Sequence, residues 1–506
     1  MAVSVSDLAA LLQNISISSE PKSGLDELKN VLSTLRIDHI QNAGGELDLR
    51  ILFDCLNSSS KEQVETSSDV LGRLLAALPA TVNIQRYPTE LDRALNHPTE
   101  AVKLLVLKQA ERCITDENAL KILKQHSGFL KNIISCIGCA ESAPAAAAVR
   151  VVTSLARHGH QEALLVLSPP LLDQLRQTMA TSDVVRYRGY EVAVSVACSS
   201  REGMKLVTDV GLLPALVQEA FGQDILVQLN ALELLTTLSQ SDHGFDHLES
   251  EGVTQRLEKL VTAPDEHPLH DYILPGVMKF FGQVGHDRPQ HVLSRYPGFA
   301  RAALAMVGHQ ELSRCLAALD TVACLGMTAA GKRALSTLEP AMTDCVTEIG
   351  RLAQNAPTEL RVRALDTLTQ LLQVKAADLT DDLLTLTRTW FSAVAPQPLD
   401  MIWSVARQPF LDLRLGALRL LAVVAALDWG QQMMVQRAGF VEYLLDRSTE
   451  SSKEGRDAKY ALVAALVTSR GAAQLPADLL SQLTTYHEQG AFYVRAQTEV
   501  ALEESS

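Results

Sequence analysis

The feature that most constrains this chain is a pair of helical patterns that recurs along its length. The pair is clearest from Gly211 to Leu238, where apolar residues follow a helical spacing on both sides of Gly222. Pro214 suits the start of the first helix, and Asp224 suits the N-cap of the second. One such pair cannot bury its apolar face alone, so it needs neighbours of the same kind.

Copies of the second helix recur along most of the chain. With Ala231 as the reference position, successive equivalents lie 41 to 53 residues apart. HEAT and armadillo repeats run about 40–47 residues, so the longest interval, from Ala364 to Ala417, predicts an insertion, which we place around Pro396–Gln408. The reference positions are Val106, Ala148, Gly189, Ala231, Gly276, Ala318, Ala364, Ala417 and Ala461.

This periodicity predicts an all-α fold, a HEAT/armadillo-like right-handed α-solenoid of roughly ten helical repeats. Each repeat of a solenoid contacts only its neighbours, so 506 residues can form one body without splitting into separate cores. We expect a single α-solenoid over residues 1–506. It would comprise an N-terminal cap or irregular repeat (1–60), armadillo/HEAT-like repeats (61–490) and an acidic C-terminal tail (491–506).

The charge and the cysteines restrict the partners and the compartment. The net charge is −14, which argues against nucleic acid as the main partner because phosphate contacts need Lys and Arg. Eight cysteines are scattered, mostly through helical patterns, as is typical of buried free thiols in a reducing compartment. We see no signal-peptide pattern and no apolar run long enough to span a bilayer. We therefore expect a cytoplasmic protein that could also enter the nucleus.

Motifs for catalysis, metals or cofactors are weak. Cys136 and Cys139 form a lone CxxC, without the second pair that a zinc site needs or the βαβ context of a thioredoxin site, and we interpret them as buried thiols at a helix end. No phosphate-binding loop, dinucleotide fingerprint or nucleophile elbow occurs, so we expect no enzyme, no cofactor and no metal. Four histidines without ligand spacing are interpreted as loop residues: His267, His270, His286 and His291.

The most informative positions lie two residues after each reference position, where the side chains point away from the apolar face. Seven of these nine residues are charged, and four of the five central ones are acidic. In an armadillo-type stack this column would line the concave groove. The column reads Lys108, Arg150, Glu191, Glu233, Met278, Asp320, Asp366, Arg419 and Val463.

Two interpretations of this column stay open. The acidic residues Glu191, Glu233, Asp320 and Asp366, with Arg150 and Arg419 towards the ends, are candidates for binding a protein partner with a basic surface. Alternatively, the column is a structural ladder of local or inter-repeat ion pairs. Arg188 and Arg363 each lie three residues before an acidic member, which is a helical pairing distance.

Four segments resemble one known family, the 26S proteasome non-ATPase regulatory subunit 5 family, and the likeness extends from about residue 25 to 495. They are VVRYRGYEVAVSVA (184–197), YILPGVMKFFGQV (272–284), AGFVEYLLDRSTESSKEGRDAKYALVAAL (438–466) and GAFYVR (490–495). The resemblance implies a helical solenoid that acts as a chaperone for assembly of the proteasome regulatory-particle base. It also implies transient binding to an AAA ATPase, 26S proteasome regulatory subunit 7. It supplies no catalytic or binding motif.

The rival hypothesis is an armadillo-type adaptor or carrier that binds basic peptide segments. Such a carrier would present a regular ladder of tryptophan and asparagine along its groove. The chain has only three tryptophans, Trp390, Trp403 and Trp429, all late in the sequence, which counts against this hypothesis.

Overall fold

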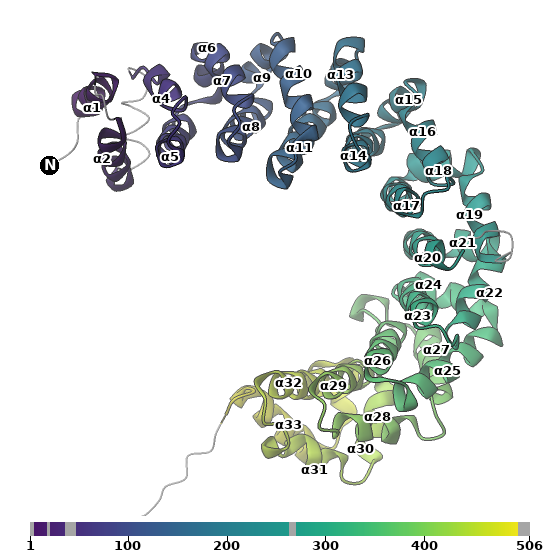
Figure 1. The fold of residues 1–506 in the computed structure, drawn as a ribbon. Helices are drawn as coiled ribbons and strands as arrows, with labels where there is room; N and C mark the ends of the chain where they lie inside the picture. Colours follow the sequence, from purple (N-terminus) through teal and green to yellow (C-terminus); the bar gives the residue numbers. More distant parts are fainter. Residues whose placement is uncertain (1–4, 18–20, 36–46, 263–269, 494–506) are drawn as a thin grey trace, which may run out of the picture. The chain divides into compact units, whose positions relative to one another are not determined.

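The computed structural model of the chain describes residues 5–17, 21–35, 47–262 and 270–493. Within these residues the regular structure is entirely helical, without a strand, and inside each of its two compact units successive repeats stack side by side (Figure 1). The predicted HEAT/armadillo-like α-solenoid architecture is confirmed. The chain divides into two compact units, Met1–His247 and Leu248–Ser506, which we call unit 1 and unit 2.

In unit 1 the long helices α5, α8, α11, α14 and α17 pack in a row, each against the next. The helices are α1 (Val5–Ile17), α2 (Pro21–Thr34), α4 (Arg50–Cys55), α5 (Lys61–Ala77), α6 (Ala80–Arg86), α7 (Pro88–Leu95), α8 (Glu100–Thr115), α9 (Glu117–Leu123), α10 (Ser127–Ser135), α11 (Ser142–His158), α12 (His160–Val166), α13 (Pro169–Met179), α14 (Asp183–Ser199), α15 (Arg201–Asp209), α16 (Leu212–Glu219) and α17 (Ile225–Ser239). A 3₁₀ turn, η1 (Cys136–Gly138), follows α10, and α18 (Asp242–Ser250) crosses the unit boundary.

In unit 2 the row of long helices is α20, α23, α26, α29 and α32. The helices are α19 (Val253–Thr262), α20 (His270–Asp287), α21 (Pro289–Arg295), α22 (Pro297–Met306), α23 (Leu312–Gly326), α24 (Ala329–Leu335), α25 (Ala341–Asn355), α26 (Thr358–Leu372), α27 (Asp381–Ala393), α28 (Pro398–Ala406), α29 (Leu411–Ala425), α30 (Asp428–Gln436), α31 (Phe440–Leu445), α32 (Lys453–Thr468) and α33 (Ala477–Gln489). Short 3₁₀ turns are η3 (Ser336–Leu338), η4 (Ala376–Asp378), η5 (Arg447–Thr449) and η6 (Arg470–Gln474).

Each regular repeat has three helices, not the two that the sequence predicted. A short helix such as α9 or α15 follows most long helices after a break of one or two residues, whereas eight residues separate α26 from α27. Asp116 caps α9 by accepting hydrogen bonds from the amides of Asn118 and Ala119, and Ser200 caps α15 through the amide of Gly203. These caps satisfy amides that would otherwise be unpaired, so the chain can turn sharply without ending its helical pattern.

The predicted turn residues around α16 and α17 are confirmed. Asp224 accepts hydrogen bonds from the amides of Leu226 and Val227 at 2.9 and 3.2 Å. Gly211 and Gly439 adopt the left-handed backbone, with φ of 79° in each, directly before α16 and α31. Only glycine adopts this conformation without a steric cost.

The predicted insertion at 396–408 is wrong, because α28 occupies that segment as an ordinary second helix of its repeat. The additional residues come earlier. They form the connection 373–380, which contains η4, and an unusually long first helix, α27, of 13 residues. The prolines at the start of the 396–408 segment had suggested an insertion there, but they lie just before α28 and at its first residue.

The reference positions form the core as predicted, except in two repeats. Ala148, Ala318, Ala364 and Ala417 have no exposed surface, and Ala231 is 2% exposed. Ala461, in contrast, is exposed, and the neighbouring predicted surface residue Val463 is buried, as is Met278. The predicted register is therefore wrong in α32 and in α20.

Two buried lysines connect helix ends in unit 2. The Lys332 ammonium donates hydrogen bonds to the carbonyl oxygens of Gly326 and Gln370, which end α23 and α26, at 2.5 and 2.9 Å. Lys459 donates to the carbonyl oxygens of Tyr443 and Asp446. Carbonyls in the last turn of a helix lack intrahelical partners, so each lysine satisfies groups that packing would otherwise leave unpaired.

No single helix in the described part of the chain is long and apolar enough to cross a membrane. Leu312–Gly326 and Ala329–Leu338 reach that length and apolar composition only when they are taken together, and the chain bends by 116° between them. Of the acidic tail predicted for 491–506, residues 494–506 lie outside the described residues.

Candidate protein-binding groove

The candidate site lies in unit 1, between the long helices α14 and α17. Ser182 caps α14 through the amide of Val185, as Asp224 caps α17. Gly189 lies at the reference position of α14, where a Cβ atom would collide with the side chain of Met179 in α13. The small residue therefore lets α14 pack closely on α13. The opposite face of α14 is directed towards solvent.

A hollow of about 530 Å³ lies between these two helices on the exposed face. It brings together two of the predicted residues, Glu191 from α14 and Glu233 from α17. Its lining residues are Arg157, Tyr187, Glu191, Val194, Ser195, Cys198, Glu233, Leu234, Thr237, Gln240 and Ser241. We call this hollow the α14/α17 groove.

The groove is lined by two carboxylates, Glu191 and Glu233, and by one guanidinium, that of Arg157. Partial burial raises the pKa of Glu191, and Arg188 opposes that shift. Burial also raises the pKa of Tyr187, and both Glu191 and Glu233 raise it further. Tyr187, Glu191 and Glu233 all line the same hollow. A cationic side chain of a partner would relieve the burial cost of the Glu191 carboxylate.

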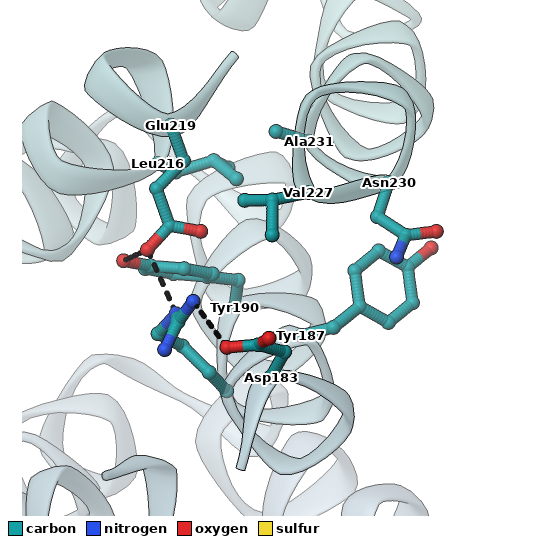
Figure 2. Close-up of a pocket in the computed structure, with 9 residues that line it drawn as sticks. Asp183, Tyr187, Tyr190, Leu216, Glu219, Val227, Asn230 and Ala231 are labelled. Atoms are coloured by element: carbon teal, nitrogen blue, oxygen red, sulfur yellow. Dashed lines mark hydrogen bonds and ion pairs between the residues drawn. The ribbon is translucent and has the colours of Figure 1, made fainter. Parts of the chain in front are cut away.

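A smaller cavity of about 20 Å³ adjoins the N-terminal half of these helices and shares Tyr187 with the groove (Figure 2). The Arg186 guanidinium forms ion pairs with Asp183 at 2.7 Å and with Glu219 of α16 at 2.9 Å. Tyr190 donates a hydrogen bond to the same Glu219 carboxylate at 3.0 Å. The cavity has room for about one water molecule, so this cluster fastens α16 to α14 rather than admitting a ligand.

The other four predicted residues form ion pairs between neighbouring repeats. Their side chains are engaged in a structural ladder, as one of the two open interpretations proposed. The pairs are Arg363–Asp320 at 3.2 Å, Arg419–Asp366 at 3.4 Å and Arg150–Glu111 at 3.1 Å.

The two local ion pairs predicted as an alternative, Arg188 with Glu191 and Arg363 with Asp366, do not form. Arg363 pairs with Asp320 of the preceding repeat rather than with Asp366. Arg188 donates to the backbone carbonyls of Ile137 and Cys139, at 2.9 and 3.0 Å, rather than to Glu191. The Glu191 carboxylate is therefore available to the groove.

Two exposed apolar side chains, missed in the sequence, lie at the N-terminal ends of the groove helices. Val184 and Leu226 occupy the first turns of α14 and α17 and are 62% and 69% exposed. Exposed apolar side chains beside a groove are candidate contacts for a partner. Both lie five residues before their reference position, so a comparison of the residues at that position across the repeats could have found them.

The histidines and the CxxC cysteines do not all lie where the sequence predicted. No group of three metal-ligand residues occurs within the described ranges. His270, His286 and His291 belong to helices α20 and α21, so their assignment to loops is wrong, whereas His267 lies outside the described residues. Cys136 is buried as expected, but Cys139 is partly exposed.

The tryptophan ladder of the carrier hypothesis has no counterpart. Trp390 is 1% exposed, and Trp403 and Trp429 are each 8% exposed. All three pack in the interior of unit 2, where they cannot contact a peptide.

Comparison with known proteins decides the family. The model of the proteasome non-ATPase 26S subunit family matches residues 6–505. The chain belongs to this family. The human 26S proteasome non-ATPase regulatory subunit 5 is 34% identical over 98% of both chains, and the Drosophila melanogaster protein of the same name is 25% identical over 89% of both. This family member therefore has a proteasome-related role, in a family that is named non-ATPase.

A solved structure agrees on the fold. The crystal structure of Kap121p bound to Pho4p aligns with 95% of this chain and 53% of its own, with a TM-score of 0.54. Sequence identity is 12%, so the likeness concerns the helical solenoid fold alone.

Proposed function

We propose that this protein is a chaperone for assembly of the 26S proteasome regulatory-particle base. In this proposal it binds an AAA ATPase subunit of the regulatory subunit 7 type through the α14/α17 groove, without catalysis of its own. Membership of the family supports the proteasome part of the proposal. The single observation that supports the binding part is the convergence of Glu191 and Glu233 on one groove.

The groove specifies the chemistry of the partner segment. A Lys or Arg of the ATPase would lie between Glu191 and Glu233. Apolar side chains of the same partner, about 10 Å away, would contact Val184 and Leu226, each of which lies seven residues before one of the glutamates. The charges steer the encounter, while the apolar contact slows dissociation. Such a small, polar interface gives modest affinity, as transient binding requires.

The mechanism is steric. While the chaperone covers one face of the ATPase, premature contacts on that face are blocked, and the growing complex later displaces the chaperone. Base assembly of this kind would take place in the cytosol, with the nucleus as a second compartment.

The test is a measurement of association and dissociation rates with purified regulatory subunit 7 at low and high salt. Replacing both Glu191 and Glu233 by Lys should slow association at least about tenfold at low salt, with a smaller effect at high salt. Replacing Val184 and Leu226 by Ser should instead accelerate dissociation and leave association nearly unchanged.

A matched control has the same net charge change elsewhere in unit 1. Asp173 and Asp209 are exposed on α13 and α15, and their double replacement by Lys should leave the association rate close to that of wild type. Equal slowing by both double variants would show a general charge effect and remove the groove from the binding site. Unchanged association with the groove variant would do the same.

A further inference from the structure

The turn from Cys136 to Cys139, which follows α10, is held closed by two sets of hydrogen bonds. The Cys139 amide donates to the Cys136 carbonyl oxygen at 3.1 Å. Arg188, which projects from α14, donates to the carbonyl oxygens of Ile137 and Cys139. A turn closed in this way keeps its end Cα atoms within about 7 Å, the range that a disulfide can bridge.

The two thiols of this turn differ in environment. Cys136 is buried, and its thiol donates a long hydrogen bond to the Leu95 carbonyl oxygen at 4.0 Å, whereas Cys139 is partly exposed. The Lys103 ammonium of α8 lies 3.6 Å from the Cys139 sulfur. A proton therefore stays on the buried Cys136, while negative charge concentrates on the Cys139 sulfur, next to the ammonium.

The charged groups around the turn agree with this assignment. The neighbouring Cys136 thiol lowers the pKa of Cys139 most, burial opposes it, Lys103 lowers the pKa further, and Glu141 opposes. From α14, the Arg188 guanidinium adds a further positive charge at the Cys139 carbonyl. The partly exposed cysteines Cys198 and Cys324 provide a contrast, because burial raises the pKa of both thiols, that of Cys324 to about 11.

We propose that Cys136 and Cys139 form a redox-reactive site, in which hydroperoxides oxidise the Cys139 thiolate and Cys136 converts the product into an intramolecular disulfide. The geometry supplies each requirement: an accessible sulfur, an ammonium that stabilises its negative charge, and a second thiol within reach. Family membership and groove binding play no part in this inference.

The chemistry needs only the peroxide as oxidant. The Cys139 thiolate attacks one peroxide oxygen, the O–O bond breaks, a sulfenic acid forms and hydroxide leaves. The Cys136 sulfur then attacks the Cys139 sulfur, and the S–O bond breaks. The departing hydroxide takes the Cys136 proton and leaves as water. Two electrons pass in total from the two sulfurs to the peroxide.

The test uses the full chain, reduced and then treated with hydrogen peroxide or with iodoacetamide. Peptide mass spectrometry should find a Cys136–Cys139 disulfide after peroxide. At about pH 7, alkylation of Cys139 should be at least about tenfold faster than that of Cys198 or Cys324. Lys103→Met should slow alkylation of Cys139 at least about threefold. Cys136→Ser should abolish the disulfide and leave a Cys139 sulfenic acid that dimedone traps.

Two results would overturn the proposal. One is alkylation of Cys139 no faster than that of the two control cysteines. The other is peroxide treatment that produces no bond between Cys136 and Cys139 while other thiols are oxidised. Circular dichroism of each variant shows whether the fold is kept. If a variant unfolds, the comparison among the three cysteines within the wild-type protein decides alone.

Discussion

Replacing Ala364 by Glu tests the packing of the long helices, and Ala461→Glu is its matched control. Both residues are alanines in long helices of unit 2, at positions that the repeat pattern treats as equivalent. Ala364 has no exposed surface, whereas Ala461 is exposed. The change in helix propensity is the same in both variants, so the difference between them isolates the effect of burial.

The magnitude follows from the two costs of placing a carboxyl group at Ala364. At about pH 7 a carboxyl group with no partner takes up a proton, which for an ordinary pKa of about 4.3 costs about 3.7 kcal/mol. Four additional heavy atoms in a packed interior cost about 1–3 kcal/mol more. Ala364→Glu should therefore lower the free energy of unfolding by about 5–7 kcal/mol, and Ala461→Glu by about 0.5 kcal/mol or less.

The assay is urea unfolding followed by tryptophan fluorescence. Trp390, Trp403 and Trp429 are all buried in unit 2, so the signal reports the unit that carries both substitutions. At about pH 5 the protonation cost falls to about 1 kcal/mol, so the gap between the variants should narrow by about 3 kcal/mol. Equal stability of the two variants, or a gap that does not change with pH, would refute this account of the packing.

Two further predictions concern polar contacts in unit 2. In a double-mutant cycle, Asp320→Ala and Arg363→Ala should show a coupling energy of about 0.2–1 kcal/mol that decreases with salt, because both side chains are about half exposed; a coupling of zero at low salt would mean that the ladder does not stabilise the fold. Burial lowers the pKa of Lys332 to about 8. From about pH 8 to 10.5 the unfolded chain binds the proton and the folded chain does not, so stability should rise with pH by up to about 3 kcal/mol relative to Lys332→Met. Parallel pH curves for wild type and Lys332→Met would contradict the burial of a charged lysine.

The sequence periodicity predicted the solenoid architecture because small residues, alanine and glycine, must recur wherever long helices pack closely. It could not find the short helices, since seven residues such as those of α9 complete only about two turns. It also placed Ala461 in the core, because α32 is apolar on more than one side, with both Ala461 and Val463 fitting an apolar stripe. Only burial by a neighbouring repeat distinguishes them.

The charged column was placed correctly outside α20 and α32, but the sequence left open which of its members bind a partner and which form a structural ladder. Glu191 and Asp320 look alike in the sequence, and both carboxyl groups are partly buried, which raises the pKa of each. Their difference arises from what the adjacent repeat presents. Arg363 reaches Asp320, whereas Arg188 is directed to backbone carbonyls. Distances between side chains of neighbouring repeats depend on how the helices pack, and this packing cannot be predicted from one sequence.

The ion pairs between repeats also bear on how the chain folds during its synthesis. Arg150 lies 39 residues from its partner Glu111, and Lys29 lies 40 residues from Asp69. At about 5–20 residues per second, the ribosome delivers the second member of such a pair about 2–8 seconds after the first. Each repeat can therefore complete its polar contacts as soon as the next one emerges, long before the last codon is read.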